Sequence, residues 1–508
     1  MRLLFKPASQ NGSLKFLYEA IMNNKILFSH SYFLRFDPKQ WATGQPYPPL
    51  ATLFAAALMR ENGYTVSLFD TMFAHSAQEV QPSINEQAPN FFVLYDDGFN
   101  YLTKMCLTNM REAAFDMMKL AKATGCTVIV SSSDSTDHFE QYLSEGADFV
   151  IIGEAEMTLL ELVQAINNKA TNFQHIPGLA FKQNNEAIKT PRRTVMKDLD
   201  ALPQPAWDLV DITPYRSMWL KSSGYFSLNI ATTRGCPFKC NWCAKPIYGN
   251  RYNARSPEKV VEELKMLKER FAFDHIWFSD DIFGLKPGWV NAFADLVEQE
   301  QLKFRFKIQA RADLLLQENT IKDLARAGCH NIWMGAESGS QKILDAMDKG
   351  TTVEQIYQAT TLLKKNGINP SFFIQFGYPG ETREDIGKTI QMIKDLLPYE
   401  MGISVSYPLP GTLFHERVKA ELTQKANWTD SDELLLMFRN TYPPRYYKKL
   451  HRYVHLVFRK QQAWVALRKV VKNPFAVSRT DFKKIASACL HMPSLLVERL
   501  QLNQYAHE

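Results

Sequence analysis

The sequence predicts an α/β protein with two successive series of alternating strands and helices, followed by a helical region. Short apolar runs alternate with helical patterns up to about residue 190, and the alternation returns between about 225 and 408. It stops beyond about residue 420, and a chain of 508 residues is long enough for two or three domains. We expect a first domain over residues 1–190, a linker over 191–222, a second domain over 223–420 and a basic helical region over 421–508.

The first series predicts a doubly wound parallel sheet. Its expected strands are MRLLFKP, YTVSLFD, NFFVLY, CTVIVS and ADFVIIG, and its expected helices are LATLFAAALMRENG, 103–124, Phe139–Ser144 and a helix from Met157. The segment PGLAFKQNNEAIKT is expected to form a small hairpin. Alternating short apolar strands and helices are typical of parallel sheets covered by helices. Such sheets bind ligands at the carboxyl ends of their strands.

The second series predicts a partial barrel. It follows PRRTVMKDLDALPQPAWDLV, which has three prolines and no periodicity and is expected to be a linker. Six strands are expected, with a helix over Pro257–Phe271 among the intervening segments: FSLNIAT, DHIWFS, FRFKIQ, HNIWMG, PSFFIQF and MGISVSY. Six β/α units are fewer than the eight of a closed barrel, so a (β/α)6 arrangement open on one side fits the count.

Three cysteines follow the first strand of the second series. Cys236, Cys240 and Cys243 lie in RGCPFKCNWC. A helix would also place them on one face, but the flanking Gly235 and Pro237 indicate a shaped loop. A structural zinc site normally shows a fourth Cys or His in register, and none lies nearby. Three thiolates can hold three irons of a 4Fe–4S cluster and leave the fourth without a protein ligand. We therefore expect a cluster on these cysteines.

Composition points to a cytoplasmic protein with reduced thiols. The other four cysteines are scattered, which does not suit a secreted disulfide framework. No signal peptide and no uncharged apolar run of membrane-spanning length is apparent. The net charge is +6, and no acidic residue lies between Glu433 and Asp481, where many lysines and arginines fall.

This basic tail leaves several readings open. It could form a packed helix with a solvated basic face, cap the barrel, attract an anionic substrate or lie on an anionic membrane surface. No module that would support binding to nucleic acid is present.

The cysteine spacing, Trp242 before the last cysteine and the segments after the later strands resemble the radical S-adenosylmethionine (SAM) superfamily. More narrowly, residues 1–420 resemble its branch with an N-terminal cobalamin-binding domain. The resemblance implies that SAM chelates the open iron and is split reductively to a 5′-deoxyadenosyl radical. It also implies that Asp280 and Asp281, in FSDDIFG, accept hydrogen bonds from the methionine ammonium. The alternative for these two residues is a capped turn before the next helix.

Other strand ends carry further cosubstrate contacts in the family. The resemblance assigns the SAM carboxylate to Arg311 in QARADLL, which suits bidentate hydrogen bonding, and the ribose hydroxyls to Glu337 in MGAESGS. Gly377 and Gly380 in FGYPGET would allow close backbone approach to adenine or ribose.

The first domain resembles the cobalamin module less closely. Gly153 and Glu154 fall in a turn that resembles the family's GEGE segment, and Ser131 and Ser132 begin a turn that usually holds glycines and a histidine. Small serines could still admit the nucleotide tail. No DxHxxG segment is present, so a histidine ligand to cobalt is not indicated. The alternative is a degenerate module that serves substrate binding or packing.

The resemblance implies three functions in order of preference. The first is a radical SAM enzyme that uses cobalamin to methylate an unactivated carbon of a small-molecule substrate, anionic or lipid-like, with an external electron donor such as flavodoxin or ferredoxin. The second is the same fold doing oxidative cyclisation or rearrangement. The third is a non-catalytic iron–sulfur or corrinoid sensor. The cofactors would be a 4Fe–4S cluster, SAM and cobalamin, which carry the difficult chemistry. The sequence gives no indication of oligomeric state.

Overall fold

The structure is a computed structural model that describes residues 24–245, 247–422, 425, 427–472 and 478–506. Its internal contacts divide the chain into two units. The first unit comprises the described residues up to Gly224 with 247–248, and the second comprises 225–245 and the residues from Gly249 onward. The expected first strand, MRLLFKP, lies outside the described residues. Among the described helices, none is long and apolar enough to cross a membrane.

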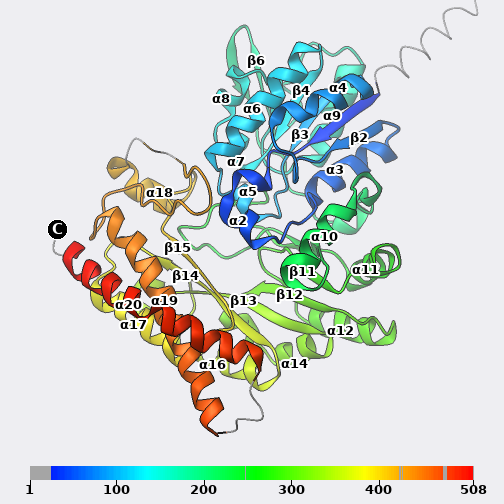
Figure 1. Ribbon diagram of the computed structural model, residues 1–508. Helices are drawn as coiled ribbons and strands as arrows, with labels where there is room; N and C mark the ends of the chain where they lie inside the picture. Colours follow the sequence, from blue (N-terminus) through cyan, green and yellow to red (C-terminus); the bar gives the residue numbers. More distant parts are fainter. Residues whose placement is uncertain (1–23, 246, 423–424, 426, 473–477, 507–508) are drawn as a thin grey trace, which may run out of the picture. The chain divides into compact units, whose positions relative to one another are not determined.

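The first unit is built on a seven-stranded sheet with the order β2-β1-β3-β4-β5-β6-β7 (Figure 1). Its first five strands are parallel: β1 (Lys25–Ser29), β2 (Thr65–Phe69), β3 (Phe91–Tyr95), β4 (Thr127–Ser131) and β5 (Phe149–Ile151). The antiparallel hairpin of β6 (Leu179–Gln183) and β7 (Glu186–Lys189) extends one edge. This order places a topological switch point between β1 and β3, where doubly wound sheets bind ligands at the carboxyl edge. The doubly wound sheet is confirmed, although β1 was not among the strands expected.

Helices cover this sheet as expected for a doubly wound fold. The α3 helix packs on α9, and α4 packs on α6. The helices are α2 (Pro38–Thr43), α3 (Leu50–Glu61), α4 (Val80–Gln87), α5 (Tyr101–Lys104), α6 (Thr108–Ala123), α7 (Ser133–Asp137), α8 (Phe139–Ser144) and α9 (Glu156–Asn167), with 3-10 turns η1 (Leu34–Phe36) and η2 (Ala77–Glu79).

The segment 191–222, expected as a linker, is folded and belongs to the first unit. It holds the 3-10 turns η3 (Leu199–Ala201) and η4 (Trp207–Leu209) and the helix α10 (Ile212–Ser223). Trp207, Tyr215 and Trp219 are fully buried, and the Trp219 indole donates to the Pro46 carbonyl at 2.7 Å. Burial of three large aromatic side chains holds this segment in place, although it shows no periodic pattern.

The second unit is built on six parallel strands in the sequential order β15-β14-β13-β12-β11-β8. They are β8 (Ser227–Ile230), β11 (His275–Phe278), β12 (Arg305–Ala310), β13 (Cys329–Glu337), β14 (Asn369–Phe376) and β15 (Met401–Val405). Each of the six strands expected from the sequence is present. The sheet curls into an open half-barrel, so the (β/α)6 expectation is confirmed.

Helices line the outer side of this sheet (Figure 1). Phe278 of β11 and Phe306 of β12 pack against Phe293 of α12, with ring centroids 5.7 and 6.1 Å apart. Because side chains alternate along a strand, their neighbours Trp277 and Lys307 point to the concave side. The helices are α11 (Pro257–Phe271), α12 (Trp289–Gln299), α13 (Ala312–Leu315), α14 (Thr320–Arg326), α15 (Gln341–Ala346), α16 (Val353–Lys365) and α17 (Arg383–Leu396).

The C-terminal region is mainly helical, as expected. It contains α18 (Leu413–Val418), the 3-10 turn η5 (Lys419–Glu421), and two long helices, α19 (Pro444–Lys472) and α20 (Arg479–Tyr505). The α19 helix packs on α17 and β15, and α20 packs along α19. The basic segment of the sequence is therefore α19.

Candidate active site

The cysteine loop leaves the carboxyl end of β8 and is closed at its base by a short ladder. In this ladder β9 (Thr233–Arg234) pairs antiparallel with β10 (Asn253–Ala254). Gly235 follows with a φ of 79°, and a Cβ added there would lie 2.4 Å from the Arg251 carbonyl oxygen. Only glycine fits such a position, so the residue before the first cysteine is determined by the loop's own geometry.

Asp280 fixes the start of this loop. Its carboxylate accepts the backbone N–H groups of Thr232 and Thr233 at 2.7 and 2.8 Å, and also the Thr232 hydroxyl. Burial raises the pKa of Asp280 to about 7, against the lowering effect of these hydrogen bonds. The neighbouring Asp281 is exposed. The structure thus gives Asp280 a positioning role, and the expected contact of both residues with the SAM ammonium stays a prediction.

The three cysteines are free thiols of intermediate exposure within one loop. Burial raises the pKa of Cys243 to about 12, and the charges of Cys240 and Cys236 add to the rise, while Lys245 opposes it. The Lys245 ammonium donates to the Phe238 carbonyl and, at 2.8 Å, to Asn250. Among the described residues no three His, Cys, Asp or Glu side chains meet at one point as ligands of a single ion. A cubane cluster takes one thiolate per iron, so its ligands bind separate metals.

Trp242 gives an independent test of whether a cluster fits here. Its indole N–H is buried and has no acceptor among the described residues. Buried indole N–H groups normally find an acceptor. A cluster sulfide or a bound cosubstrate would supply one, so the loop fits an added acceptor group.

Asn241 anchors the segment between the second and third cysteines. Its side-chain amide donates to the Ala346 carbonyl and to Asp348, each at 2.8 Å, and its side-chain oxygen accepts the Tyr378 hydroxyl at 2.9 Å. Sequence reasoning missed Asn241, although it lies inside the cysteine motif. Its partners are about a hundred residues away in sequence or more, and no local pattern indicates them.

Arg311 connects the end of β12 to the cysteine loop. One guanidinium nitrogen lies 3.9 Å from the Cys240 sulfur and donates to the Lys349 carbonyl at 2.7 Å. The guanidinium stacks over Phe238 at 3.7 Å and also pairs with Asp313 at 3.0 Å. Its donors therefore face protein acceptors, and the expected contact with the SAM carboxylate stays a prediction.

Glu337 and Lys349 form a buried ion pair beside the same cysteine. The Lys349 ammonium lies 2.8 Å from Glu337 Oε1, and both side chains are less than a tenth exposed. Burial alone lowers the pKa of Lys349, but the Glu337 carboxylate and the Cys240 thiol outweigh it and raise the pKa. A Cβ at Gly335 would lie 2.6 Å from this ammonium, so the glycine leaves room for the pair. The contact of Glu337 with ribose stays a prediction, and Lys349 was missed because nothing in its local sequence distinguishes it.

The two glycines after β14 differ in their surroundings. A Cβ at Gly377 would lie 3.2 Å from both Leu436 and Tyr447 of the C-terminal region. Close protein packing therefore accounts for Gly377. Gly380 has open space at that position, and its carbonyl accepts the Lys342 ammonium at 2.9 Å. The expected contact of both with adenine or ribose stays a prediction, and Gly380 has the room for it.

Aromatic side chains lie on the concave face of the half-barrel. Trp333 of β13 and Phe373 of β14 have ring centroids 4.8 Å apart, and the Lys307 ammonium lies 5.4 Å from the Trp277 ring centre. Burial lowers the pKa of Lys307 to about 8, with Glu400 acting in the opposite direction. This face can therefore offer apolar ring surface and one cation to a bound molecule.

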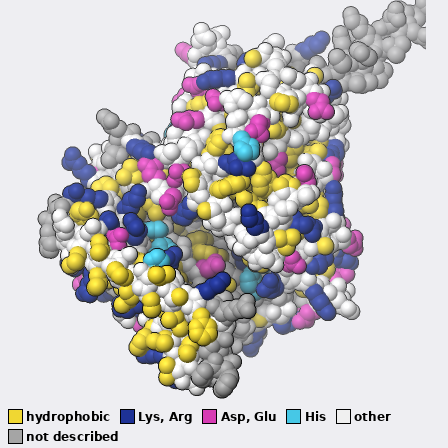
Figure 2. Space-filling view, in the orientation of Figure 1, with side chains coloured by type: hydrophobic (Ala, Val, Ile, Leu, Met, Phe, Trp, Pro, Cys, Tyr) yellow, Lys and Arg dark blue, Asp and Glu magenta, His cyan; other side chains and the backbone are white. Residues whose placement is uncertain are grey.

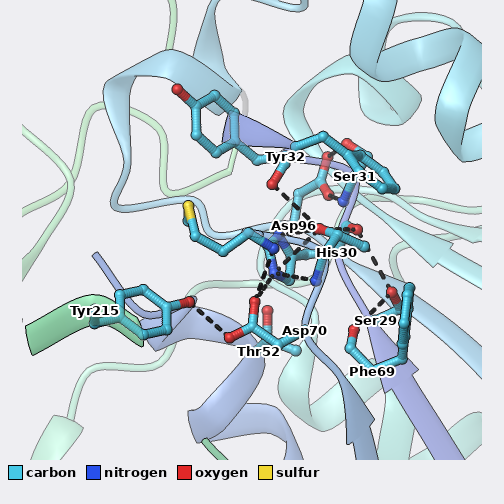
Figure 3. A network of polar contacts seen from close by, with 12 residues as sticks. Ser29, His30, Ser31, Tyr32, Thr52, Phe69, Asp70, Asp96 and Tyr215 are labelled. Carbon is cyan, nitrogen blue, oxygen red and sulfur yellow. Dashed lines mark hydrogen bonds and ion pairs between the residues drawn. The ribbon is translucent and has the colours of Figure 1, made fainter. Parts of the chain in front are cut away.

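The carboxyl edge of the first unit's sheet carries a separate polar network (Figure 3). His30 follows β1 and lies 2.8 Å from Asp70, which also accepts the Tyr215 hydroxyl at 2.6 Å. The other ring nitrogen of His30 lies 3.1 Å from the Thr71 hydroxyl. Burial alone raises the pKa of Asp70, but the contacts with His30 and Tyr215 lower it overall. Both ring nitrogens of His30 thus have protein partners, and the absence of a histidine ligand to cobalt stays a prediction.

The residues expected to border a nucleotide tail also have protein partners. The Ser131 carbonyl accepts the Asp96 N–H at 2.9 Å, and Ser132 caps α7 by exchanging hydrogen bonds with Ser135 at 2.8 and 2.9 Å. A Cβ at Gly153 would lie 2.7 Å from the Arg192 guanidinium, and Glu154 accepts the Met196 N–H. The structure brings these residues to the carboxyl edge, and their contact with cobalamin stays a prediction.

A small hollow lies among these groups. Ser31 donates twice to Asp96, at 2.6 and 2.8 Å, and Arg111 pairs with Asp134. Asp134 also accepts the Tyr142 hydroxyl at 2.8 Å. The hollow that these residues line has a volume of about 10 Å³, roughly room for one water molecule. The hollow is therefore too small for a bulky group.

A family comparison agrees with the geometry of the cysteine loop. Residues 230–393 match the family described as the Radical SAM superfamily. These residues form a radical SAM domain. An uncharacterized methyltransferase of Pyrococcus horikoshii is 28% identical over 398 residues, which are 76% of this chain and 82% of that protein. The hopanoid C-3 methylase of Methylococcus capsulatus is 24% identical over 436 residues, 84% of this chain and 79% of that protein.

Relatives named for another activity match over a similar length. The anaerobic magnesium-protoporphyrin IX monomethyl ester cyclase of Rubrivivax gelatinosus is 25% identical over 382 residues, 73% of this chain. The chain spans 66% of that cyclase.

Solved structures share the fold of the radical SAM domain and of the unit before it. The cobalamin-dependent SAM radical enzyme OxsB has a TM-score of 0.69 at 17% identity, over 95% of this chain and 77% of that one. The radical SAM methyltransferase TsrM from Kitasatospora setae, solved with cobalamin and a [4Fe-4S] cluster, has a TM-score of 0.66 at 18% identity, over 78% and 75%. The expected resemblance to the cobalamin-domain branch is therefore confirmed at the level of the fold.

Proposed function

We propose that the chain is a cobalamin-dependent radical SAM methyltransferase that acts on an unactivated carbon. The position of the cysteine loop carries the proposal. Its three thiols follow the first strand of a parallel half-barrel, in a chain whose first unit is a doubly wound sheet with its own switch point. The methyltransferase names of two relatives and of TsrM support this reading.

Cys236, Cys240 and Cys243 would hold the 4Fe–4S cluster. When bound, the cluster, SAM and cobalamin would supply reductive cleavage, hydrogen abstraction and methyl transfer. The protein's part is to shape and charge the site. Lys245 and Arg311 bring positive charge to the thiolates, because both make hydrogen bonds within or against the cysteine loop.

Residues around the cluster would position the cosubstrate. Lys349 orients the Glu337 carboxylate through a buried ion pair. The Trp242 N–H would donate to whichever acceptor occupies the loop. We propose SAM contacts for Asp281, Arg311, Glu337 and Gly380, and a positioning role for Asp280.

Cobalamin would lie at the carboxyl edge of the first unit. Serines 131–133 and 135, Ser31 and the acidic residues after β3 offer donors and acceptors to the amide groups of a corrin ring. The His30 ring is engaged with Asp70 and Thr71, so the cobalt would have no histidine ligand from this loop.

The aromatic wall on the concave face favours an apolar, ring-containing or lipid-like substrate. Trp277, Trp333 and Phe373 offer ring surfaces, and Lys307 could meet an anionic group. We also propose that the enzyme is cytoplasmic and takes its electrons from an external donor such as flavodoxin or ferredoxin.

Metal content and product analysis test the proposal. Protein from cobalamin-fed cells, purified without oxygen, should hold about four iron and one cobalt per chain. Given SAM with an isotopically labelled methyl group and a reductant, it should transfer label to its substrate and release 5′-deoxyadenosine. Iron without cobalt, and product without label, would refute methyl transfer.

A second candidate, oxidative ring formation, is favoured by the cyclase relatives. The same assay separates the two functions. A cyclase would consume SAM and form 5′-deoxyadenosine, but its product would lose hydrogen and gain no labelled methyl group.

A further inference from the structure

The outer face of α20 carries a continuous apolar stripe that no described part of the unit covers. Its large side chains recur at helical spacing on one side of the helix. They are Phe482 (58% exposed), Leu490 (78%), Met492 (44%), Leu496 (63%), Val497 (51%) and Leu500 (69%). Figure 2 shows hydrophobic side chains gathered at the lower left, where Figure 1 draws α19 and α20.

The inner face of the same helix is partly polar, the reverse of an ordinary packed surface helix. Glu498 is buried there and lies 3.3 Å from Lys449 and 3.5 Å from Arg452 of α19. Asp481 is buried likewise and lies 2.9 Å from Lys469. The helix thus uses its acidic residues to bind α19 and turns its large apolar residues outward.

The distal end of α19 extends the same surface. Its first half buries six large side chains against the unit: Tyr446, Tyr447, Leu450, Val454, Val457 and Phe458. Beyond Ala463 four large apolar residues are exposed: Trp464 (50%), Val465 (46%), Leu467 (40%) and Val471 (77%). The apolar surface therefore continues from α20 onto the distal end of α19.

The charged residues of α19 and α20 indicate which kind of partner fits this surface. The two helices carry thirteen lysines and arginines and two acidic residues, whereas the whole chain has a net charge of +6. Both acidic residues are the ones buried in the ion pairs with α19. Exposed Arg459, Lys460, Arg468, Lys472, Lys483 and Lys484 thus flank the apolar residues with positive charge alone.

We propose that α20 and the distal end of α19 dock the enzyme on an anionic lipid membrane. Apolar residues flanked by lysine and arginine on a helix lying in the membrane plane are typical of interfacial binding. The apolar side chains would enter the acyl boundary, and the cations would meet anionic head groups. This inference does not rest on the proposed function, because it concerns helices outside the half-barrel strands and the cysteine loop.

Vesicle flotation of the full-length holoenzyme tests it. The protein should float with vesicles that contain phosphatidylglycerol and stay unbound with phosphatidylcholine alone, and high salt should weaken binding. The variant Leu490→Asp with Leu496→Asp and Leu500→Asp should lower the partition coefficient at least about tenfold. Lys483→Glu with Lys484→Glu should lower it roughly tenfold on anionic vesicles, and this variant decides the case if the leucine variant fails to fold.

Leu220→Asp is the matched control, because Leu220 is 49% exposed but lies on α10 of the first unit. It should bind vesicles as the unchanged protein does. Absent flotation, equal binding to neutral vesicles, or unchanged binding by the α20 variants would overturn the proposal. So would a dimer in solution that the leucine variant dissociates, because a second copy would then cover the stripe. Iron content and 5′-deoxyadenosine formation report the proposed function separately.

Discussion

The two carboxyl edges of this molecule satisfy their polar groups in opposite ways. At the edge of the half-barrel the thiols of Cys236, Cys240 and Cys243 lie among cations, and the Trp242 N–H lacks an acceptor among the described residues. At the edge of the first unit's sheet several polar side chains bind one another. There His30 pairs with Asp70, Ser31 with Asp96, and Arg111 with Asp134.

The difference indicates how each edge would receive a cofactor. The half-barrel edge leaves the Trp242 N–H without an acceptor among the described residues and three thiols free to bind metal, so a cluster would add bonds there. At the first unit's edge His30–Asp70, Ser31–Asp96 and Arg111–Asp134 are already paired, so a nucleotide tail entering among these residues would have to displace protein contacts, although the buried Ser133 hydroxyl has no partner among the described residues. Displacing these contacts should weaken the binding of cobalamin. Cobalamin should therefore be lost more easily than the cluster.

Removing one thiol should have the largest effect. Cys240→Ala should lose the cluster and abolish 5′-deoxyadenosine formation, because each cysteine binds a different iron. Cys489→Ala is the control, since Cys489 is an exposed thiol on α20. Iron content and 5′-deoxyadenosine in the anaerobically purified variants measure the effect. Continued 5′-deoxyadenosine formation by Cys240→Ala would disprove the cluster assignment.

Breaking the buried ion pair in the first unit should be the next largest effect. Arg111→Leu leaves the Asp134 carboxylate buried and uncompensated, which should destabilise the unit by about 3–5 kcal/mol. Hydrogen exchange of the β4 amides reports this local stability. Arg60→Leu removes an ion pair whose partners are 40% and 47% exposed, and should cost less than about 1 kcal/mol. Equal protection of β4 in both variants would mean that the network does not stabilise this edge.

Lys349 tests whether charge around the thiols matters at the other edge. Lys349→Met removes the cation beside Cys240 and Glu337, and should lower the rate of SAM cleavage by about 10–100-fold. The cluster's reduction potential should become more negative, because a nearby positive charge is lost. Lys388→Met is the control, since Lys388 pairs with Glu384 on the surface. If both variants keep the potential and rate of the unchanged protein, the role given to Lys349 is wrong.

Buried carboxyl groups should make the two edges respond to pH in different windows. Burial raises the pKa of Glu381, near the half-barrel edge, from 4.5 to about 8, and that of Asp97, after β3, from 3.8 to about 6. Between the two values of each pKa the folded protein keeps a proton that the unfolded chain has released. Stability should therefore fall as pH rises, by about 1.4 kcal/mol per pH unit for each group. Above about pH 6, Glu381 is the one of these two groups that still makes stability depend on pH.

Thermal unfolding between about pH 6 and 8 measures this slope. Glu381→Gln should reduce it, whereas Asp97→Asn should change the slope only below about pH 6. Glu384→Gln, at an exposed side chain, should leave it unchanged. An unaltered slope in Glu381→Gln would show that this carboxyl is ionised in the folded protein.

Sequence patterns predicted the fold and the position of the cysteine loop better than the surroundings of the site. Strand periodicity located all six half-barrel strands, and the helix Pro257–Phe271 has the predicted bounds. The cysteines could be predicted because they lie close together in sequence. Lys349 and Asn241 could not, because they reach the site through contacts with residues that are distant in sequence. The helix α10 was missed because it buries only Tyr215 and Trp219, one helical turn apart, which is too few residues to make a periodic pattern.

Substitution of Ser132 should have the smallest effect. It separates two roles of this serine, capping α7 and donating to cobalamin. If Ser132 acts as the N-cap of α7, Ser132→Ala should lower the stability of the unit by about 1 kcal/mol, and Ser132→Thr should restore the cap. If Ser132 donates a hydrogen bond to cobalamin, Ser132→Ala should hold less cobalt per chain than its lower stability explains. Cobalt per chain and hydrogen exchange of α7 in the two variants separate these effects. If Ser132→Thr restores the exchange protection but not the cobalt, the serine binds the cofactor. If Ser132→Thr restores both the exchange protection and the cobalt, Ser132 supports cobalamin binding only by stabilising the fold of this edge.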